Sequence, residues 1–153
     1  MAKTKINKTH SKIKIGIVAS KFNDYITKRL LKGCWEGLSQ QGINPKNITT
    51  VWVPGAFDIP VVALKLAKKK DIKAVICLGS VIKGETYHFN LVARGCADGI
   101  LQAALLTEKP IIFGVLATYT VDQAYNRSEE KGDNKGRDAA LATIEMIDLC
   151  SQL

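Results

Sequence analysis

The chain has 153 residues, of which 46% are hydrophobic and 24% charged, a composition typical of one globular domain large enough to bury a core. Its apolar runs are too short for a membrane span and its first residues lack the apolar segment of a secretory signal, so we expect a cytoplasmic protein without a membrane partner. The net charge of +8 arises from 22 basic and 14 acidic residues, with five lysines among the first fourteen positions. Because aromatic residues are not interleaved with the basic ones, we expect no nucleic-acid partner and favour a small anionic substrate.

The four cysteines, Cys34, Cys77, Cys96 and Cys150, are far apart and form no Cys-x-x-Cys pair. This spacing matches neither a zinc site nor a disulfide framework. We therefore expect reduced thiols that pack as small hydrophobic side chains, and no metal site.

Residues 1–12 are polar and lysine-rich, and we expect a flexible basic tail followed by a single domain at 13–153. Apolar, β-branched runs predict strands at residues 13–19, 47–53, 74–78 and 110–117. Apolar residues at helical spacing predict helices at residues 23–41, 56–69, 89–106 and 121–126, and a last helix after residue 136. Asn23 is the expected side-chain cap of the first helix, and Pro60 falls in the first turn of the second, where it is tolerated.

The last helix is expected to turn Ala140, Ile144, Ile147 and either Leu149 or Cys150 inward. Four nearly continuous apolar strands that alternate with helices predict an α/β fold, a four-stranded parallel sheet in a three-layer α/β/α arrangement with helices on both faces. Ligands of such sheets bind beyond the carboxyl ends of the strands. The segments that leave those ends are residues 20–23, 54–58, 79–88 and 117–120, and the unusual motifs of the sequence fall in them.

Residues 78–91, LGSVIKGETYHFNL, connect a buried strand to a helix and hold the main functional signal. Gly79 and Gly84 free the backbone to approach a ligand, and the unpaired amides of residues 85–87 at a helix start suit an anion such as phosphate. His88 stands beside them and can exchange protons near neutral pH. The alternative is that the glycines only shape a connection and that His88 is a surface residue of the helix.

The same segment nearly matches the P-loop pattern Gly-x-x-x-x-Gly-Lys-Ser/Thr. Gly79 and Gly84 have the required spacing, but Glu85 occupies the position of the P-loop lysine. A carboxylate there repels the outer phosphates of a nucleotide, so nucleotide hydrolysis is excluded.

Three further side chains have two interpretations each. Phe22 directly follows the first strand and either stacks on a planar heterocycle or packs as a hydrophobic staple on the following helix. Asp58 either caps its helix or accepts hydrogen bonds from a polyol. Phe113 alternates within a strand and is by default a core residue.

Four motifs together resemble the lumazine synthase family of riboflavin biosynthesis, in the right order and over nearly the whole chain. They are SKFN at 20–23, VPGAFDIP at 53–60, GSVIKGETYHF at 79–89 and NKG at 134–136. The resemblance implies a flavodoxin-like fold and a transferase. Its reaction condenses 5-amino-6-(D-ribitylamino)uracil with 3,4-dihydroxy-2-butanone 4-phosphate to 6,7-dimethyl-8-ribityllumazine, with no metal and no organic cofactor.

The resemblance also implies roles for the motif residues. Phe22 stacks on the pyrimidine, residues 56–58 hold the ribityl chain, and residues 80–82 line the pyrimidine pocket with Phe113. The site residues implied in this way are Phe22, Ala56, Phe57, Asp58, Ser80, Val81, Ile82 and Phe113 for the pyrimidine substrate; Glu85, Thr86 and Arg127 for the phosphate; and His88 for proton transfer. Arg127 is implied to reach in from a neighbouring subunit.

The chain departs from the family pattern at two positions. Members often carry glutamate where this chain has Asp58, and the shorter aspartate has less reach to the ribityl hydroxyls. Members also often carry an acidic residue where this chain has Asn90.

By resemblance we expect a homopentamer. The compact connection at 128–136 favours the members that pack twelve pentamers into a 60-subunit shell, whereas the positive charge argues weakly against one. Two rival classes remain open at this point, a flavin-binding module without chemistry and a shell protein that has lost catalysis.

Overall fold

The computed structural model describes residues 10–153. Residues 1–9 of the expected tail lie outside the described part. Within that part, no helix is long and apolar enough to cross a bilayer. The elements run in the order β1 (Lys14–Ser20), α1 (Asp24–Gln40), η2 (Pro45–Asn47), β2 (Ile48–Val53), η3 (Ala56–Asp58), α2 (Ile59–Ala67), β3 (Ile72–Ile82), α3 (His88–Thr107), β4 (Ile111–Thr118), α4 (Val121–Asn126) and α5 (Lys135–Cys150).

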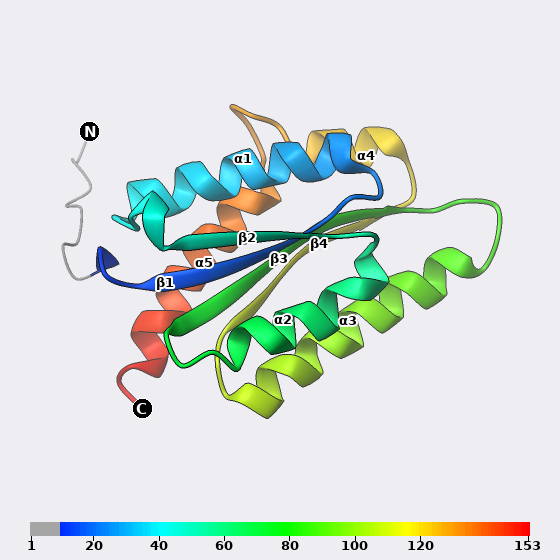
Figure 1. Ribbon diagram of the computed structural model, residues 1–153. Helices are drawn as coiled ribbons and strands as arrows, with labels where there is room; N and C mark the ends of the chain where they lie inside the picture. The colour runs from blue at the N-terminus through cyan, green and yellow to red at the C-terminus, as the bar shows by residue number, and fades with distance from the viewer. Residues whose placement is uncertain (1–9) are drawn as a thin grey trace.

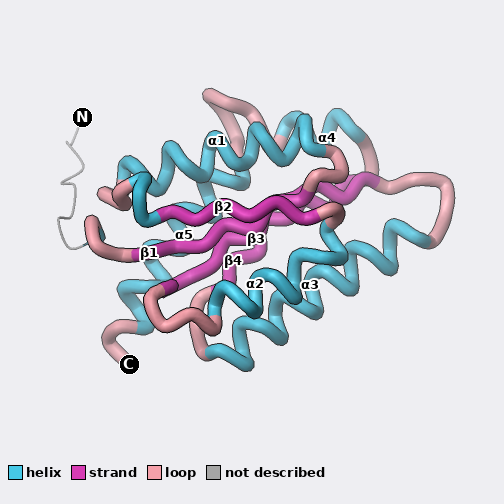
Figure 2. The backbone as a smooth tube through the Cα atoms, in the orientation of Figure 1, coloured by secondary structure: helices cyan, strands magenta, loops and turns pink. Residues whose placement is uncertain are grey.

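Four parallel strands form one sheet in the order β2-β1-β3-β4. Helices α1, α4 and α5 cover one face and helices α2 and α3 cover the other (Figure 1). Viewed as a tube, the sheet lies between the two helical layers (Figure 2). The predicted α/β class, the parallel sheet and the three layers are therefore confirmed.

Alternation along the strands explains the two helical layers. In β1, Ile15 and Ile17 pack under α1 and α5, whereas Val18 packs under α2 and α3, and all three are fully buried. Each such side chain contributes about 1.5–3 kcal/mol through burial, so a strand with apolar residues on both sides stabilises both layers at once. This two-sided burial is what makes the strands read as continuous apolar runs.

The strand β3 is longer than predicted, because it runs on through Gly79 to Ile82 and does not end at Leu78. Its extension pairs with β4 as far as Ile82 and Thr118. Gly79 therefore lies inside a strand, where a Cβ would be 2.5 Å from the Ser20 Oγ. The expectation that Gly79 opens the backbone to a ligand is wrong; its lack of a side chain makes room for Ser20.

Asn23 lies at the N-cap of the first helix, as predicted, but its side chain does not cap the helix. Its backbone is in the left-handed region, at φ 58°, and its side chain makes no capping hydrogen bond. Instead its Nδ2 donates to the carbonyl oxygen of Ser80 at 2.9 Å, which ties the β1–α1 turn to the end of β3. The second helix begins later than predicted, because η3 intervenes, and Pro60 does fall in the first turn of α2.

Some burial expectations fail at the periphery of the molecule. Phe113 is 48% exposed, because β4 is an edge strand. Ala140, Ile144 and Ile147 are buried as predicted, but Leu149 and Cys150 are both exposed at the end of α5. Cys34, Cys77 and Cys96 are buried free thiols, as expected.

His10 anchors the start of the described chain to the domain. Its ring is buried, with Nδ1 3.1 Å from the carbonyl oxygen of Gln41 and Nε2 2.9 Å from a carboxylate oxygen of Asp148. The segment immediately before β1 is thus held against the ends of α1 and α5.

Candidate active site

The loops that leave β1, β2 and β3 are tied together at the carboxyl edge of the sheet. The backbone amides of Lys21 and Phe22 donate to the carbonyl oxygens of Val53 and Pro54 at 2.8 and 3.1 Å. The Asn23 side chain supplies the link to β3 described above. These bonds hold the predicted motifs in fixed positions relative to one another.

A cavity of about 720 Å³ opens at this edge, between the sheet and the start of α3. Its volume suits a small organic ligand. Its lining consists of Phe22, Pro54, Gly55, Ala56, Phe57, Asp58, Ser80, Val81, Ile82, Gly84, Thr86, His88, Phe89, Leu91 and Val92. Nine of the predicted site residues, from three segments that are separate in the sequence, thus meet around one space.

Phe22 is 72% exposed although it borders the cavity. A hydrophobic staple would be buried against the following helix, so that interpretation does not describe this side chain. An aromatic face left in solvent at the mouth of an apolar cavity is suited to stacking on a planar ring.

The turn after β2 shapes a second wall. The Asp58 carboxylate accepts a hydrogen bond from the Gly55 amide at 3.0 Å, which closes η3 and agrees with the capping interpretation. The ring of Phe57 is 62% exposed and lies over α3 at Gly95, where a Cβ would be 2.5 Å from the ring. Asp58 is therefore both a structural cap and the carboxylate of the cavity lining.

His88 is the first residue of α3 and an exposed member of the lining. Its own amide lies 3.4 Å from the Thr86 Oγ1. Within the described residues, the amides of residues 85–87 have no backbone or side-chain acceptor, as expected at a helix start. The imidazole and this set of donors lie at the same end of the cavity, which is the arrangement a proton transfer next to an anion requires.

The lining is mainly apolar. Among its residues only Asp58 and His88 are titratable. The residues that the sequence argument missed, Phe89, Leu91 and Val92, belong to the first turns of α3. Helical spacing places residues 88, 91 and 92 on one face, a signal that was available in the sequence.

Three predicted site residues lie outside this cavity. Glu85 is in the loop before α3 but is not part of the lining. Phe113 borders a separate hollow of about 270 Å³ beside β4 and the start of α5. Arg127 follows α4, where it is exposed and its Nη1 donates to the carbonyl oxygen of Gln123 at 3.1 Å. A single chain does not bring Phe113 and Arg127 to His88.

Within residues 10–153, His, Cys, Asp and Glu side chains form no group of three that could hold a metal ion. A parallel α/β sheet with an apolar cavity, an imidazole and free helix amides at its carboxyl edge defines the chain as a small-molecule enzyme of the α/β class.

Comparison with known proteins identifies the family to which this enzyme belongs. The model of the 6,7-dimethyl-8-ribityllumazine synthase family matches residues 12–151. A 6,7-dimethyl-8-ribityllumazine synthase from Protochlamydia amoebophila (strain UWE25) is 50% identical over 143 residues, which cover 94% of this chain and 83% of the relative. The chain belongs to the 6,7-dimethyl-8-ribityllumazine synthase family.

The family and the transferase activity of riboflavin biosynthesis expected from the four motifs are thereby confirmed. The match decides between the rival classes in favour of the enzyme.

Proposed function

We propose that the cavity binds 5-amino-6-(D-ribitylamino)uracil and that the chain condenses it there with 3,4-dihydroxy-2-butanone 4-phosphate, releasing phosphate and water. The observation that carries this assignment is the convergence of the motif residues on one cavity. The exposed Phe22 ring offers a stacking face for the uracil, and the η3 turn offers the Asp58 carboxylate to the ribityl hydroxyls.

The chemistry asks mainly for orientation and proton transfer. The amine nitrogen adds to the ketone carbonyl and water leaves to give an imine; elimination then breaks a carbon–oxygen bond and releases phosphate. The ribityl-bearing nitrogen closes the ring, with loss of a second water. Holding both substrates in one cavity makes the first step effectively unimolecular, and His88 is placed to move protons in the later ones.

The phosphate is bound at the start of α3 in this proposal. Gly84 and Thr86 line the cavity there, and the free amides of residues 85–87 provide donors. These groups carry no full positive charge, and His88 is the one basic residue of the lining. A phosphate dianion is therefore only partly neutralised by one chain, and the guanidinium of Arg127 from a second copy supplies what is missing.

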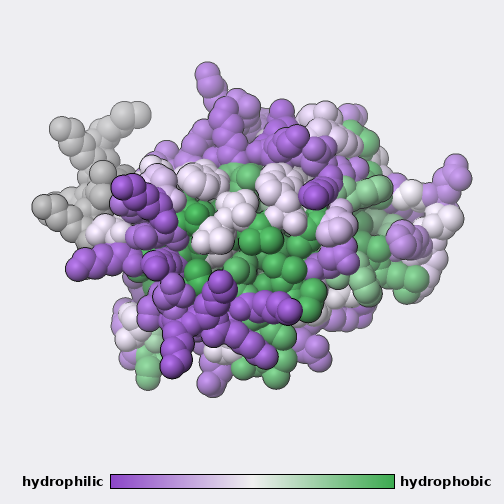
Figure 3. Space-filling model, in the orientation of Figure 1, coloured by the Kyte–Doolittle hydropathy of each residue, from purple (hydrophilic) through white to green (hydrophobic). Residues whose placement is uncertain are grey.

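Surface features support this second copy. Large apolar side chains of α3 are exposed, among them Leu101, Leu105 and Leu106, and the edge strand β4 exposes Phe113. Apolar side chains also reach the surface between α1 and α2, on the side of the edge strand β2 (Figure 3). In a closed ring, one head-to-tail contact gives every cavity a neighbour that brings Arg127 and Phe113.

We propose a pentamer for this ring, and the 60-subunit shell stays a prediction of the sequence, as does the cytoplasmic location. Light scattering separates the assemblies, because five chains of 16.7 kDa give about 84 kDa and sixty give about 1,000 kDa. A single species of monomer mass would contradict the shared site.

The activity is tested by mixing the two substrates with the purified protein and following the absorbance of the lumazine together with the release of phosphate. Both signals should rise in equal amounts. Phosphate release without the chromophore, or neither signal, would contradict the proposed reaction.

A further inference from the structure

One buried carboxamide lies at the end of the connection between α4 and α5, residues 127–134, and links its inner part to the domain. The side chain of Asn134 is 2% exposed and precedes α5 directly. Its Oδ1 accepts from the amides of Gly136 and Arg137 at 2.9 and 3.1 Å, which caps α5. Its Nδ2 donates to the carbonyl oxygens of Arg29 in α1 and of Glu129 in the connection, at 3.2 and 3.1 Å.

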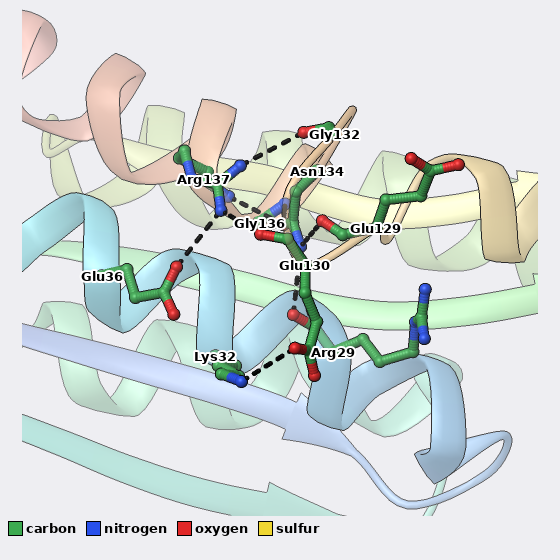
Figure 4. Close-up of polar contacts among 9 residues, drawn as sticks. All are labelled: Arg29, Lys32, Glu36, Glu129, Glu130, Gly132, Asn134, Gly136 and Arg137. Carbon is green, nitrogen blue, oxygen red and sulfur yellow. Dashed lines mark hydrogen bonds and ion pairs between the residues drawn. The ribbon is translucent and has the colours of Figure 1, made fainter.

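Every hydrogen-bonding valence of this carboxamide is used, two donors and two lone pairs. Figure 4 shows Asn134 between α1 and the connection, with these contacts drawn as dashed lines. Two glycines permit this arrangement. A Cβ on Gly33 would collide with the carboxamide itself, and one on Gly136 would collide with the carbonyl of Leu30. The close approach of α1 and α5 is therefore built around this side chain.

The backbone of Arg127 belongs to the same unit. Its carbonyl oxygen accepts from the Lys135 amide at 2.9 Å, and the next residue, Ser128, forms a β-bridge with Asn134. The Arg29 Nε donates to the carbonyl oxygen of Ser128 at 3.0 Å. The Asn134 Nδ2 donates to the carbonyl oxygens of Arg29 and Glu129 on either side, so it links the segment that carries Arg127 to α1.

The outer part of the connection is held by different groups. Arg137 donates to the carbonyl oxygens of Glu130 and Gly132 at 2.8 and 3.2 Å and to the Glu36 carboxylate at 3.2 Å (Figure 4). Lys32 forms an ion pair with Glu130 at 3.0 Å. These contacts lie away from Arg127 in the chain, which provides a natural control.

We propose that Asn134 is a positioning residue for phosphate recognition, which holds the backbone of Arg127 so that the guanidinium meets the substrate phosphate. This inference rests on the proposed role of Arg127 as a phosphate ligand. The Arg127 side chain is exposed and makes one hydrogen bond, to the helix that precedes it. The direction in which the guanidinium points is therefore set mainly by the backbone of this residue. An error of about 1 Å in the placement of such a group is enough to weaken its action strongly.

The test uses Asn134→Asp, which keeps the Oδ acceptor for α5 but replaces the Nδ2 donor with an oxygen that faces two carbonyls. We expect the KM for the butanone phosphate to rise about tenfold and that for the pyrimidine to change less than about twofold, since only the phosphate contact is displaced. The control Arg137→Ala should leave both constants within about twofold, because it loosens the outer connection alone. Asn134→Ser, which also retains an acceptor for the α5 amides, serves where the aspartate variant does not fold.

A double-mutant cycle with Arg127→Ala gives the decisive readout. If Asn134 acts through Arg127, Asn134→Asp should have no further effect on the KM for the butanone phosphate once the guanidinium is gone. Additive effects, or equal increases in both Michaelis constants, would overturn the inference. An unchanged KM in the Arg127→Ala single variant would instead contradict the proposed phosphate role itself, so the two failures are distinguishable.

Discussion

Replacing Gly95 with alanine should separate substrate binding from stability. Gly95 lies within α3, and its new Cβ would be 2.5 Å from the Phe57 Cε2 and 3.0 Å from Cδ2. Ordinary van der Waals contact begins at 3.4 Å, so the ring must move by 3.4 minus 2.5, or about 1 Å. Because Phe57 is 62% exposed, the ring can swing away at little cost, and it lines the cavity, so this wall changes shape.

Two terms decide the stability of this variant. Alanine in a helix interior is favoured over glycine by about 1 kcal/mol, and displacement of an exposed ring offsets only part of that gain. The melting temperature should therefore stay unchanged or rise by about 2–4 °C. The KM for the ribitylaminouracil should rise about tenfold, because a 1 Å displacement of a binding wall spoils its fit.

Gly99→Ala is the matched control. Its Cβ would lie 2.6 and 2.7 Å from the Cγ and Cβ of Pro60, a ring fixed covalently to the backbone of α2. Because that ring cannot swing, α2 and α3 must separate, at a cost of about 1–3 kcal/mol that cancels or exceeds the helix-propensity gain. Thermal unfolding at fixed protein concentration and Michaelis constants for both substrates measure the pair. A fall in the melting temperature of Gly95→Ala as large as that of Gly99→Ala, or unchanged binding of the pyrimidine to Gly95→Ala, would contradict these expectations.

Four further predictions follow from single side chains. His88→Ala should lower kcat about a hundredfold, the usual contribution of one acid–base group, and leave the melting temperature unchanged because the side chain is exposed; near-normal turnover would remove His88 from the chemistry. Phe22→Ala should raise the KM for the pyrimidine and spare that for the butanone phosphate, as measured by varying each substrate in turn; equal effects would argue against stacking. Lys109→Met should cost about 2 kcal/mol in denaturant unfolding, since its Nζ donates to three backbone carbonyls at 2.7–2.8 Å around the end of α2 and the start of β3; an unchanged midpoint would show that water replaces it freely. Burial raises the pKa of the Cys34 thiol from 9.0 to about 12, so the unfolded chain loses this proton at a lower pH than the folded protein, and the free energy of unfolding should fall as the pH rises from 9 toward 12. A Cys34→Ala variant that loses as much stability over this pH range would contradict this origin.

The sheet and its layers were predictable because burial on both faces leaves a direct trace in the sequence. The limits of β3 were not, since a glycine inside an otherwise apolar run is typical of a turn. Gly79 is tolerated in the strand because Ser20 of the neighbouring β1 occupies the space of its missing side chain, a contact between residues far apart in sequence. The side-chain cap expected from Asn23 is absent for the same reason, because its Nδ2 donates to the carbonyl oxygen of Ser80, which is far away in the sequence.

Only part of the candidate site could be predicted from the sequence, for a similar reason. Residues that follow strands directly, such as Phe22 and Ala56, could be placed at one edge from topology alone. Phe113 could not, because the sequence does not reveal that β4 is an edge strand. Arg127 is placed by a folded connection centred on Asn134, whose four hydrogen bonds depend on helices that precede and follow it.

Completion of each cavity by a second copy of the chain is tested most sharply by mixing two impaired variants and assaying them with the butanone phosphate well below the KM of Arg127→Ala. His88→Ala supplies intact Arg127, and Arg127→Ala supplies an intact cavity with His88. When the two are co-expressed in equal amounts, random assembly gives about one quarter of the sites both groups, and the condensation rate should recover to about that fraction of the unmodified enzyme. Recovery with a mixed oligomer of unchanged mass supports the shared site. A mixture no more active than the better of the two variants alone would contradict it.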